Sequence, residues 1–158
     1  MAHLTDLWLA RRGRRAALRF VRPYVERTRW RLGADPGQAW MEPYALGFLT
    51  GLITLVARPL MGRSRGELLG LVQVEVWATL TGLPDIAAGE RILTLSLGQD
   101  LDFALGLREA LDFHAAVQAR ARRDALADEA GTQTIHDLWD SLIGFRLEAG
   151  PVRAPGAP

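Results

Sequence analysis

Apolar side chains recur at alternating spacings of four and three between Asp100 and about Ala127, which is the pattern of one face of an α-helix. The positions on this face, the apolar seam, are Phe103, Leu107, Ala110, His114, Val117 and Ala121. A stripe of this length needs other apolar surface to cover it. Because the segments upstream also show helical periodicity between proline and glycine residues, the sequence predicts an all-α fold.

Helix start and stop signals divide the rest of the chain into further predicted helices. The first predicted helix covers residues 5–21, and Pro23 either kinks it or starts a second piece that reaches Leu32. The next predicted helices cover residues 42–59, residues 64–82 with Ser64 as the cap, and residues 85–97 with Asp85 as the cap. A last helix is predicted to begin at Thr132 or Thr134. Residues 91–97 alternate like a strand, but a lone strand has no partner, so we predict a helix. The last helix is expected to direct these side chains toward the core: Ile135, Leu138, Trp139, Leu142 and Phe145.

These segments predict one helical domain over residues 1–149 and a Pro/Gly/Ala-rich tail over 150–158. The domain is predicted to be a single-domain bundle of five or six helices with a kinked basic N-terminal helix over residues 1–32. The chain has no cysteine, which excludes a thiolate zinc site, an iron–sulfur cluster and a cysteine nucleophile. Arginines interrupt the N-terminus before any apolar run of secretory length, so we expect a cytoplasmic location.

Charge is distributed unevenly along the chain. Residues 1–32 hold nine arginines against Asp6 and Glu26, a net charge of +7. Residues 33–158 hold ten arginines against sixteen carboxylates, a net charge of −6. The total of +1 therefore hides a polarised molecule.

The N-terminal arginines gather on one side of their predicted helix. At about 100° per residue, one sector roughly 100° wide holds a set that we call the arginine face. Its members are Trp8, Arg11, Arg12, Arg15, Arg19 and Arg22. The opposite half is apolar and holds Leu9, Ala10, Gly13, Ala16, Ala17, Phe20, Val21 and Tyr24. The segment is therefore a basic amphipathic helix, and the arginine face is the candidate partner-binding site.

Four interpretations of the arginine face compete. Its charges are neutralised by carboxylates of the same fold (Asp100, Asp102, Glu109, Asp112), or they bind nucleic-acid phosphates while Trp8 and Trp30 stack on bases. Alternatively they attach the helix to an anionic membrane surface, or they dock on an acidic protein surface, which includes a second copy of this chain.

We adopt as hypothesis a non-enzymatic interaction or assembly subunit that docks the arginine face on an acidic protein surface or in a homo-oligomer. Nucleic-acid binding is the first alternative, and peripheral attachment to an anionic membrane surface is the second. A possible second interface lies on the apolar seam, at Phe103, Leu107, His114 and Val117.

Catalytic patterns are sparse, so we expect no enzymatic activity, no cofactor and no metal. Residues 62–66 match the G-x-S-x-G pattern of a hydrolase nucleophile, but the chemistry needs a strand before Ser64, and the preceding segment is helical. His136 and Asp140 are spaced to share a helix face and are the enzyme alternative, as two ligands of a metal site. No His-Glu-x-x-His pattern accompanies them, and we predict that the pair serves local electrostatics instead.

Two small-residue spacings occur in the most apolar part of the chain, between Tyr44 and Leu83. Gly47 and Gly51, and Gly66 and Gly70, would allow helix backbones to approach closely. In a bilayer this stretch would form a short hairpin, but Gln73 and Glu75 would lie inside the membrane. We therefore predict tight packing in a protein core, with Trp40 and Trp77 also buried there.

Overall fold

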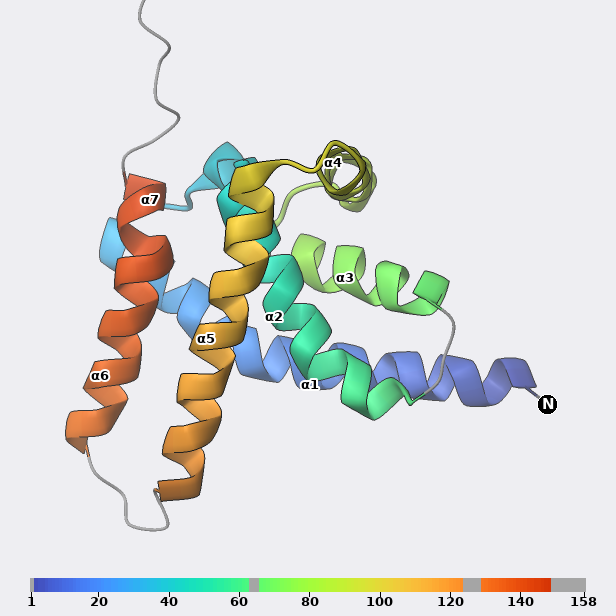
Figure 1. Cartoon of the computed structure of the whole chain (residues 1–158), viewed down its shortest axis with the longest axis horizontal. Helices are drawn as coiled ribbons and strands as arrows, with labels where there is room; N and C mark the ends of the chain where they lie inside the picture. The colour runs from blue at the N-terminus through green and yellow to red at the C-terminus, as the bar shows by residue number, and fades with distance from the viewer. Residues whose placement is uncertain (1, 63–65, 124–128, 149–158) are drawn as a thin grey trace, which may run out of the picture.

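The computed structural model describes residues 2–62, 66–123 and 129–148. Its elements are α1 (Ala2–Leu32), the 3-10 helix η1 (Gly37–Met41), α2 (Pro43–Met61), α3 (Gly66–Thr81), α4 (Asp85–Leu97), α5 (Leu101–Arg123), α6 (Glu129–Trp139), the π-helical turn η2 (Asp140–Gly144) and α7 (Phe145–Glu148). The described residues contain no strand, and α1 to α6 pack together (Figure 1). The predicted all-α helical bundle is confirmed.

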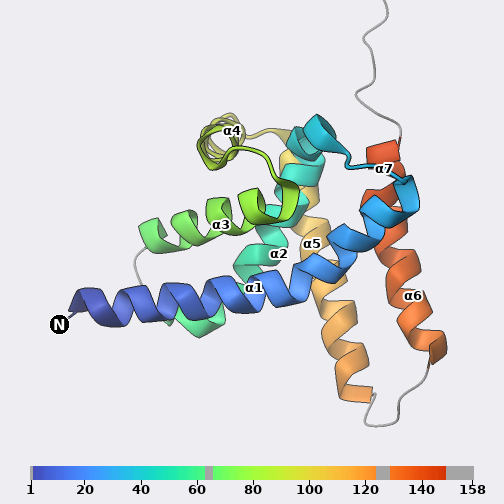
Figure 2. The ribbon, with the colours of Figure 1, turned by 180° about the vertical axis from the view of Figure 1, so that it is seen from behind.

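The first helix is long and bent. Pro23 lies inside α1, and Figure 2 shows the helix turning toward α6 and α7 in its C-terminal part. Proline lacks an amide hydrogen and clashes with the preceding turn, so a bend is its expected consequence. Gly33 follows the helix with a φ of 67°, a backbone conformation that favours glycine. The predicted kinked helix ending at Leu32 is confirmed.

The centre of the core is α2, which packs between α1 and α5. Among the described residues, α2 is the one helix long and apolar enough to cross a membrane, and 67% of its apolar window is buried inside the protein. The polar residues of the apolar stretch have partners. Gln73 donates a hydrogen bond to Thr54 Oγ1 (2.7 Å), and Glu75 forms an ion pair with Arg14 (3.4 Å). Core packing therefore accounts for the apolar character of α2.

A close backbone contact joins α2 to α5 and depends on glycine. A Cβ added at Gly47 would collide with the carbonyl oxygen of Phe103, and one added at Gly106 would collide with the carbonyl oxygen of Tyr44. Gly51 lies similarly close to α5. The predicted tight packing of the first glycine pair is confirmed. Trp40 and Trp77 are fully buried, as predicted.

The second glycine pair behaves differently. Among the described residues, a Cβ at Gly66 or Gly70 would meet no atom within 4 Å outside its own helix backbone. The prediction of tight packing at these two positions is wrong, because no helix in the described part of the chain packs against Gly66 or Gly70.

Alanine substitutions at the two kinds of glycine should change stability in opposite directions. Gly47→Ala pushes α2 away from α5 and should lower the free energy of unfolding by about 1–3 kcal/mol. Gly70→Ala fills open space and removes backbone freedom from a helix interior, so it should raise that free energy by about 0.5–1 kcal/mol. Chemical denaturation followed by circular dichroism measures both, and a neutral Gly47→Ala would contradict the close contact.

The ambiguous segment 91–97 is helical and belongs to α4, as predicted. Leu95 faces the core and is 6% exposed, whereas Leu93 and Leu97 are 60% and 76% exposed on the opposite side. Residues four apart share a helix face, and the residue midway between them points away from it. The leucine alternation that resembled a strand therefore gives α4 one buried and one exposed apolar side.

This arrangement predicts unequal costs for two leucine truncations in α4. Leu95→Ala removes buried methyl groups and should lower the free energy of unfolding by about 2–4 kcal/mol. Leu93→Ala truncates an exposed side chain and should change it by less than about 0.5 kcal/mol. The two variants form a matched pair in one thermal-denaturation series, and similar losses would argue against this orientation of α4.

The C-terminal segment departs from its prediction in two ways. α6 begins at Glu129, so the predicted opening at Thr132 or Thr134 is wrong. After Trp139 the chain makes the π-helical turn η2, whose wider turn changes the direction of the side chains that follow. Phe145, which was predicted to face the core, is therefore 60% exposed. The buried apolar side chains here are instead Ile143, within the turn, and Leu147, in α7.

The remaining predicted boundaries have mixed outcomes. Asp85 is the first residue of α4, and its carboxylate accepts a hydrogen bond from the adjacent Ile86 amide. Its assignment as the cap is wrong, because Pro84 occupies that position. Asp100 accepts a hydrogen bond from the Phe103 amide (2.9 Å) and caps α5. Ser64, the predicted end of α5 near residue 127 and the tail over 150–158 lie outside the described residues.

Candidate functional site

The arginine face of α1 is exposed over its whole length. Arg11, Arg12, Arg15, Arg19 and Arg22 are all exposed, and Trp8 is 58% exposed. The face points outward because the other side of α1 is buried against α2 and α3. The buried positions of α1 recur every three or four residues at Gly13, Ala17, Val21, Val25 and Thr28. The sequence therefore located both sides of this helix.

The arginines of α1 divide into two groups by their partners. Four that lie off the arginine face form ion pairs: Arg14 with Glu75 (3.4 Å), Arg27 with Asp140 (3.0 Å), Arg29 with Asp35 (2.6 Å) and Arg31 with Glu148 (2.8 Å). Within the described parts of the chain, the five arginines of the face form no ion pair. The arginines of α1 that lie toward the rest of the protein are thus paired with carboxylates. Those of the arginine face remain free to interact with a partner.

Neutralisation by the four carboxylates considered from the sequence is not observed among the described residues. Glu109 accepts a hydrogen bond from the Tyr44 hydroxyl, and Asp100 caps α5. Asp102 and Asp112 are exposed and form no ion pair with the arginine face. The charge of the arginine face is therefore directed at solvent.

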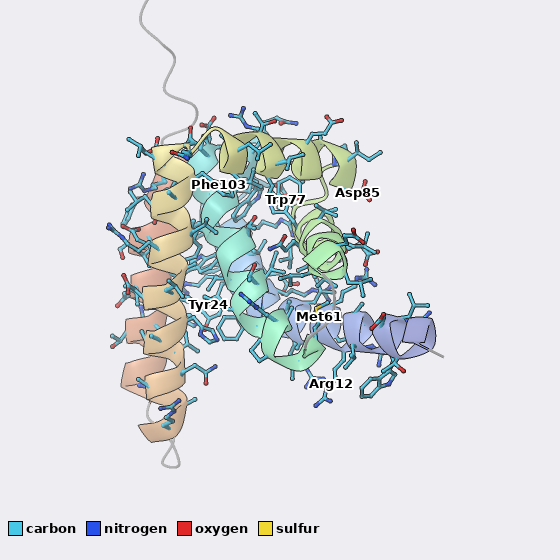
Figure 3. The ribbon with its side chains drawn as sticks, turned by 45° about the vertical axis from the view of Figure 1, so that its right-hand side comes forward. Arg12, Tyr24, Met61, Trp77, Asp85 and Phe103 are labelled. Carbon is cyan, nitrogen blue, oxygen red and sulfur yellow. The ribbon has the colours of Figure 1, made fainter. Side chains whose placement is uncertain are left out.

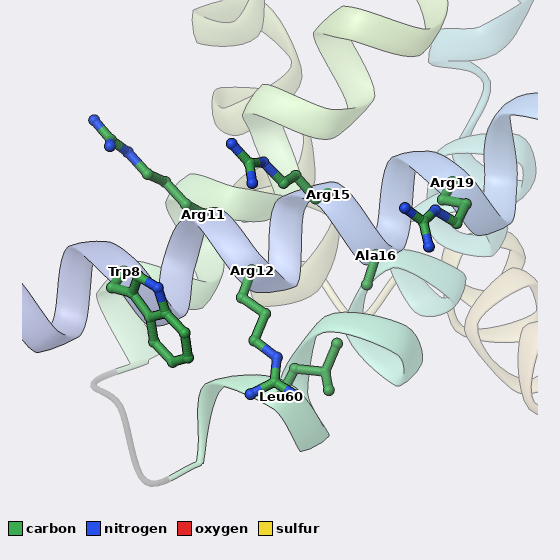
Figure 4. Close-up of a pocket in the computed structure, with 7 residues that line it drawn as sticks. All are labelled: Trp8, Arg11, Arg12, Arg15, Ala16, Arg19 and Leu60. Carbon is green, nitrogen blue, oxygen red and sulfur yellow. The ribbon is translucent and has the colours of Figure 1, made fainter.

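The arginine face borders a shallow surface groove, which we call the arginine groove (Figure 4). Its volume is about 420 Å³, and it is lined by Trp8, Arg11, Arg12, Arg15, Ala16, Arg19 and Leu60. Arg12 extends toward Leu60 of α2, and its guanidinium carbon lies 5.6 Å from the centroid of the Trp8 ring. Such a cation–π contact holds charge beside an apolar surface. Arg22 is exposed but does not line the groove.

A second groove, which we call the apolar groove, continues from the first. It has a volume of about 500 Å³ and is lined by Ala16, Arg19, Phe20, Pro23, Tyr24, Val56, Val117 and His136. Ala16 and Arg19 line both grooves. The sequence did not indicate this groove, because its walls come from four helices that only the folded chain brings together.

The residues of the predicted second interface pack against other helices of the same protein. Phe103 is 3% exposed and packs under α2, so it is unavailable to a partner and its assignment to an interface is wrong. Leu107, His114 and Val117 are half-buried, and the His114 ring lies 5.6 Å from the Phe20 ring. The apolar seam therefore pairs α5 with α2 and α1, and its Val117 also lines the apolar groove.

The exposed side of α4 is an apolar surface that sequence analysis missed. Ile86, Leu93 and Leu97 are each more than half exposed and lie on one side of the helix. Their spacing of seven and four residues is a helical signal that was present in the sequence. The strand-like alternation of residues 93–97 masks this helical signal.

The two residues of the enzyme alternative make different contacts in the structure. Asp140 accepts a hydrogen bond from Arg27 and is buried, while the His136 ring lies at the edge of the Tyr24 ring (6.2 Å). The described residues contain no cluster of three histidine, aspartate or glutamate side chains that could hold a metal ion. Ser64 of the G-x-S-x-G pattern lies outside those residues. The absence of catalysis stays a prediction.

Comparison with known proteins gives no further guide to function. No protein-family model matches the chain, and neither a curated protein nor a solved structure shows significant similarity to it.

The environment of His114 predicts a pH dependence of stability. Burial lowers the pKa of His114 below its usual value of 6.5. The unfolded chain therefore binds a proton more readily, and the free energy of unfolding should fall as the pH drops below about 6.5. Measured between pH 7.5 and 5.5, this loss should be smaller in His114→Gln than in the wild type. Identical pH profiles would contradict a role of burial at His114.

Proposed function

We propose that this protein is a non-enzymatic interaction or assembly subunit that docks its arginine face on an acidic protein surface. The observation that supports this is the division of the α1 arginines. Arg14, Arg27, Arg29 and Arg31 have carboxylate partners, whereas the five arginines of the face are exposed without an ion pair among the described residues. Complementary carboxylates on a partner would supply orientation and a fast rate of association.

A membrane surface fits the geometry less well. An amphipathic helix binds a bilayer by burying its apolar side among the lipids. In α1 that side is already buried, with Ala17, Val21 and Val25 fully covered by the protein's own helices. Attachment in this mode would require α1 to leave the bundle.

Nucleic acid is also a weaker candidate. Trp8 and Trp30 are separated by about 33 Å along α1, so they do not form one stacking platform. The rest of the chain carries a net charge of −6, which repels an extended polyanion. A compact acidic protein surface can contact the arginine face without meeting this negative charge.

Charge reversal on the arginine face tests the proposal. The variant Arg11→Glu, Arg15→Glu, Arg19→Glu should bind a poly-glutamate peptide at least about tenfold more weakly than the wild type at low salt, because three guanidinium contacts become repulsive. The matched control reverses Arg91, Arg108 and Arg122, which are also exposed, and should keep wild-type binding. Fluorescence anisotropy measures the affinities, and circular dichroism verifies that helicity is retained.

The same assay separates the alternatives. Equal losses in the two triple variants would contradict a specific arginine face. Tight, strongly salt-dependent binding of duplex DNA with weak binding of poly-glutamate would favour nucleic acid instead. Light scattering at low and high salt identifies the partner as a second copy if a protein-only oligomer dissociates as salt rises.

A further inference from the structure

The apolar groove lies directly beside the arginine groove and shares part of its wall. Phe20, Pro23 and Tyr24 line it from α1, and one residue each comes from α2, α5 and α6. The midpoint of the α1 residues that line the arginine groove and the midpoint of those that line the apolar groove are about seven positions apart in the sequence. This separation is about 10 Å along the helix, or two helical turns. A ligand that crosses from one to the other would meet cations first and apolar side chains second.

The wall of the apolar groove is supported from behind by the core. The Tyr24 ring contacts the rings of Phe113 and Trp139, each at 5.1 Å between centroids. Phe113 and Trp139 are themselves fully buried, so the wall cannot collapse inward. Figure 3 shows Tyr24 in the angle between α5 and α2. The groove is therefore a formed feature of the surface.

The polar groups of the apolar groove are few. Arg19 stands at its junction with the arginine groove, and His136 and the Tyr24 hydroxyl are the other polar groups of its lining. Apolar pockets with a small number of polar groups are typical binding sites for large apolar groups. The guanidinium of Arg19 makes a nearby carboxylate on that ligand favourable.

We propose that the apolar groove receives one large apolar side chain of the acidic protein segment that docks on the arginine face. This inference rests on the proposed function and specifies its partner as an acidic amphipathic helix, with carboxylates about two turns away from a phenylalanine-like anchor. Helix-in-groove recognition uses anchors of this kind, and a single buried aromatic side chain often dominates the affinity.

The openness of the groove favours a protein side chain over a free lipid. It lies along the surface of four helices, so one side of any occupant stays in contact with solvent. A small amphiphile gains most of its affinity when its surface is largely enclosed. A side chain held by neighbouring carboxylate contacts does not need such enclosure.

Two synthetic helical peptides test the inference. Both peptides carry the same glutamates over two helical turns. They differ at a single position two turns beyond the glutamates, which is Phe in one peptide and Ser in the other. Calorimetry with the full chain should show that the Phe peptide binds about tenfold more tightly or better, as expected for an anchor side chain. Val117→Gln and Val56→Gln alter the apolar groove without touching the arginine groove, and either folded variant should remove the difference between the peptides while keeping the affinity for the Ser peptide.

The outcomes distinguish the inference from the proposed function. If both peptides bind equally and both lose affinity in the Arg11, Arg15 and Arg19 triple variant, the arginine face stands and the apolar groove is not a binding site. If neither peptide binds the wild type, the proposed function itself fails. If dodecanoate or phosphatidylserine vesicles bind in a Val117-dependent way while the Phe peptide gains nothing, the occupant is an anionic lipid and the inference is overturned.

Discussion

The glycine-dependent contact between α2 and α5 sets the position of the surrounding helices. It brings the Phe48 and Phe113 rings within 5.9 Å of each other. Phe113 then meets the rings of Trp139 (5.5 Å) and Tyr24 (5.1 Å), which joins α6 and α1 to the central pair. A wider separation of α2 and α5 would open this aromatic cluster. The orientation of α1 and the shape of the apolar groove therefore depend on two backbones that approach without side chains between them.

The rotation of α1 about its axis is fixed in both halves of the helix, and this decides where its arginines point. In the N-terminal half, a Cβ on Gly13 would lie 2.9 Å from Met61 Cγ, so the helix rests closely on α2. Near the C-terminal end, Thr28 Oγ1 accepts a hydrogen bond from Trp139 Nε1 (2.8 Å), and Asp140 accepts one from Arg27. A helix held this way presents its charges in one orientation, which lowers the ordering cost of binding.

Local features of the structure were largely predictable from the sequence. Helical periodicity and the positions of proline and glycine located α1 to α5, and the helical wheel identified the exposed side of α1 because its buried positions are small or apolar. The features that were missed depend on contacts between distant segments. Gly47 and Gly70 look alike in the sequence, and only the position of α5 distinguishes them. The π-helical turn after Trp139 moved Phe145 to the surface, and no simple residue pattern announces such a turn.

The arginine face is energetically unfavourable in the free protein. Arg11, Arg15 and Arg19 follow one another at four-residue spacing, and like charges at this spacing destabilise a helix by about 0.2–0.5 kcal/mol per pair. Carboxylates from a partner would relieve this repulsion, so the relief adds to the attraction between the two surfaces. Charge alone does not fix register, because one carboxylate can exchange among several neighbouring guanidinium groups. An apolar side chain in the adjoining groove would fix it, because the aromatic wall of the apolar groove stands at one end of the arginine groove.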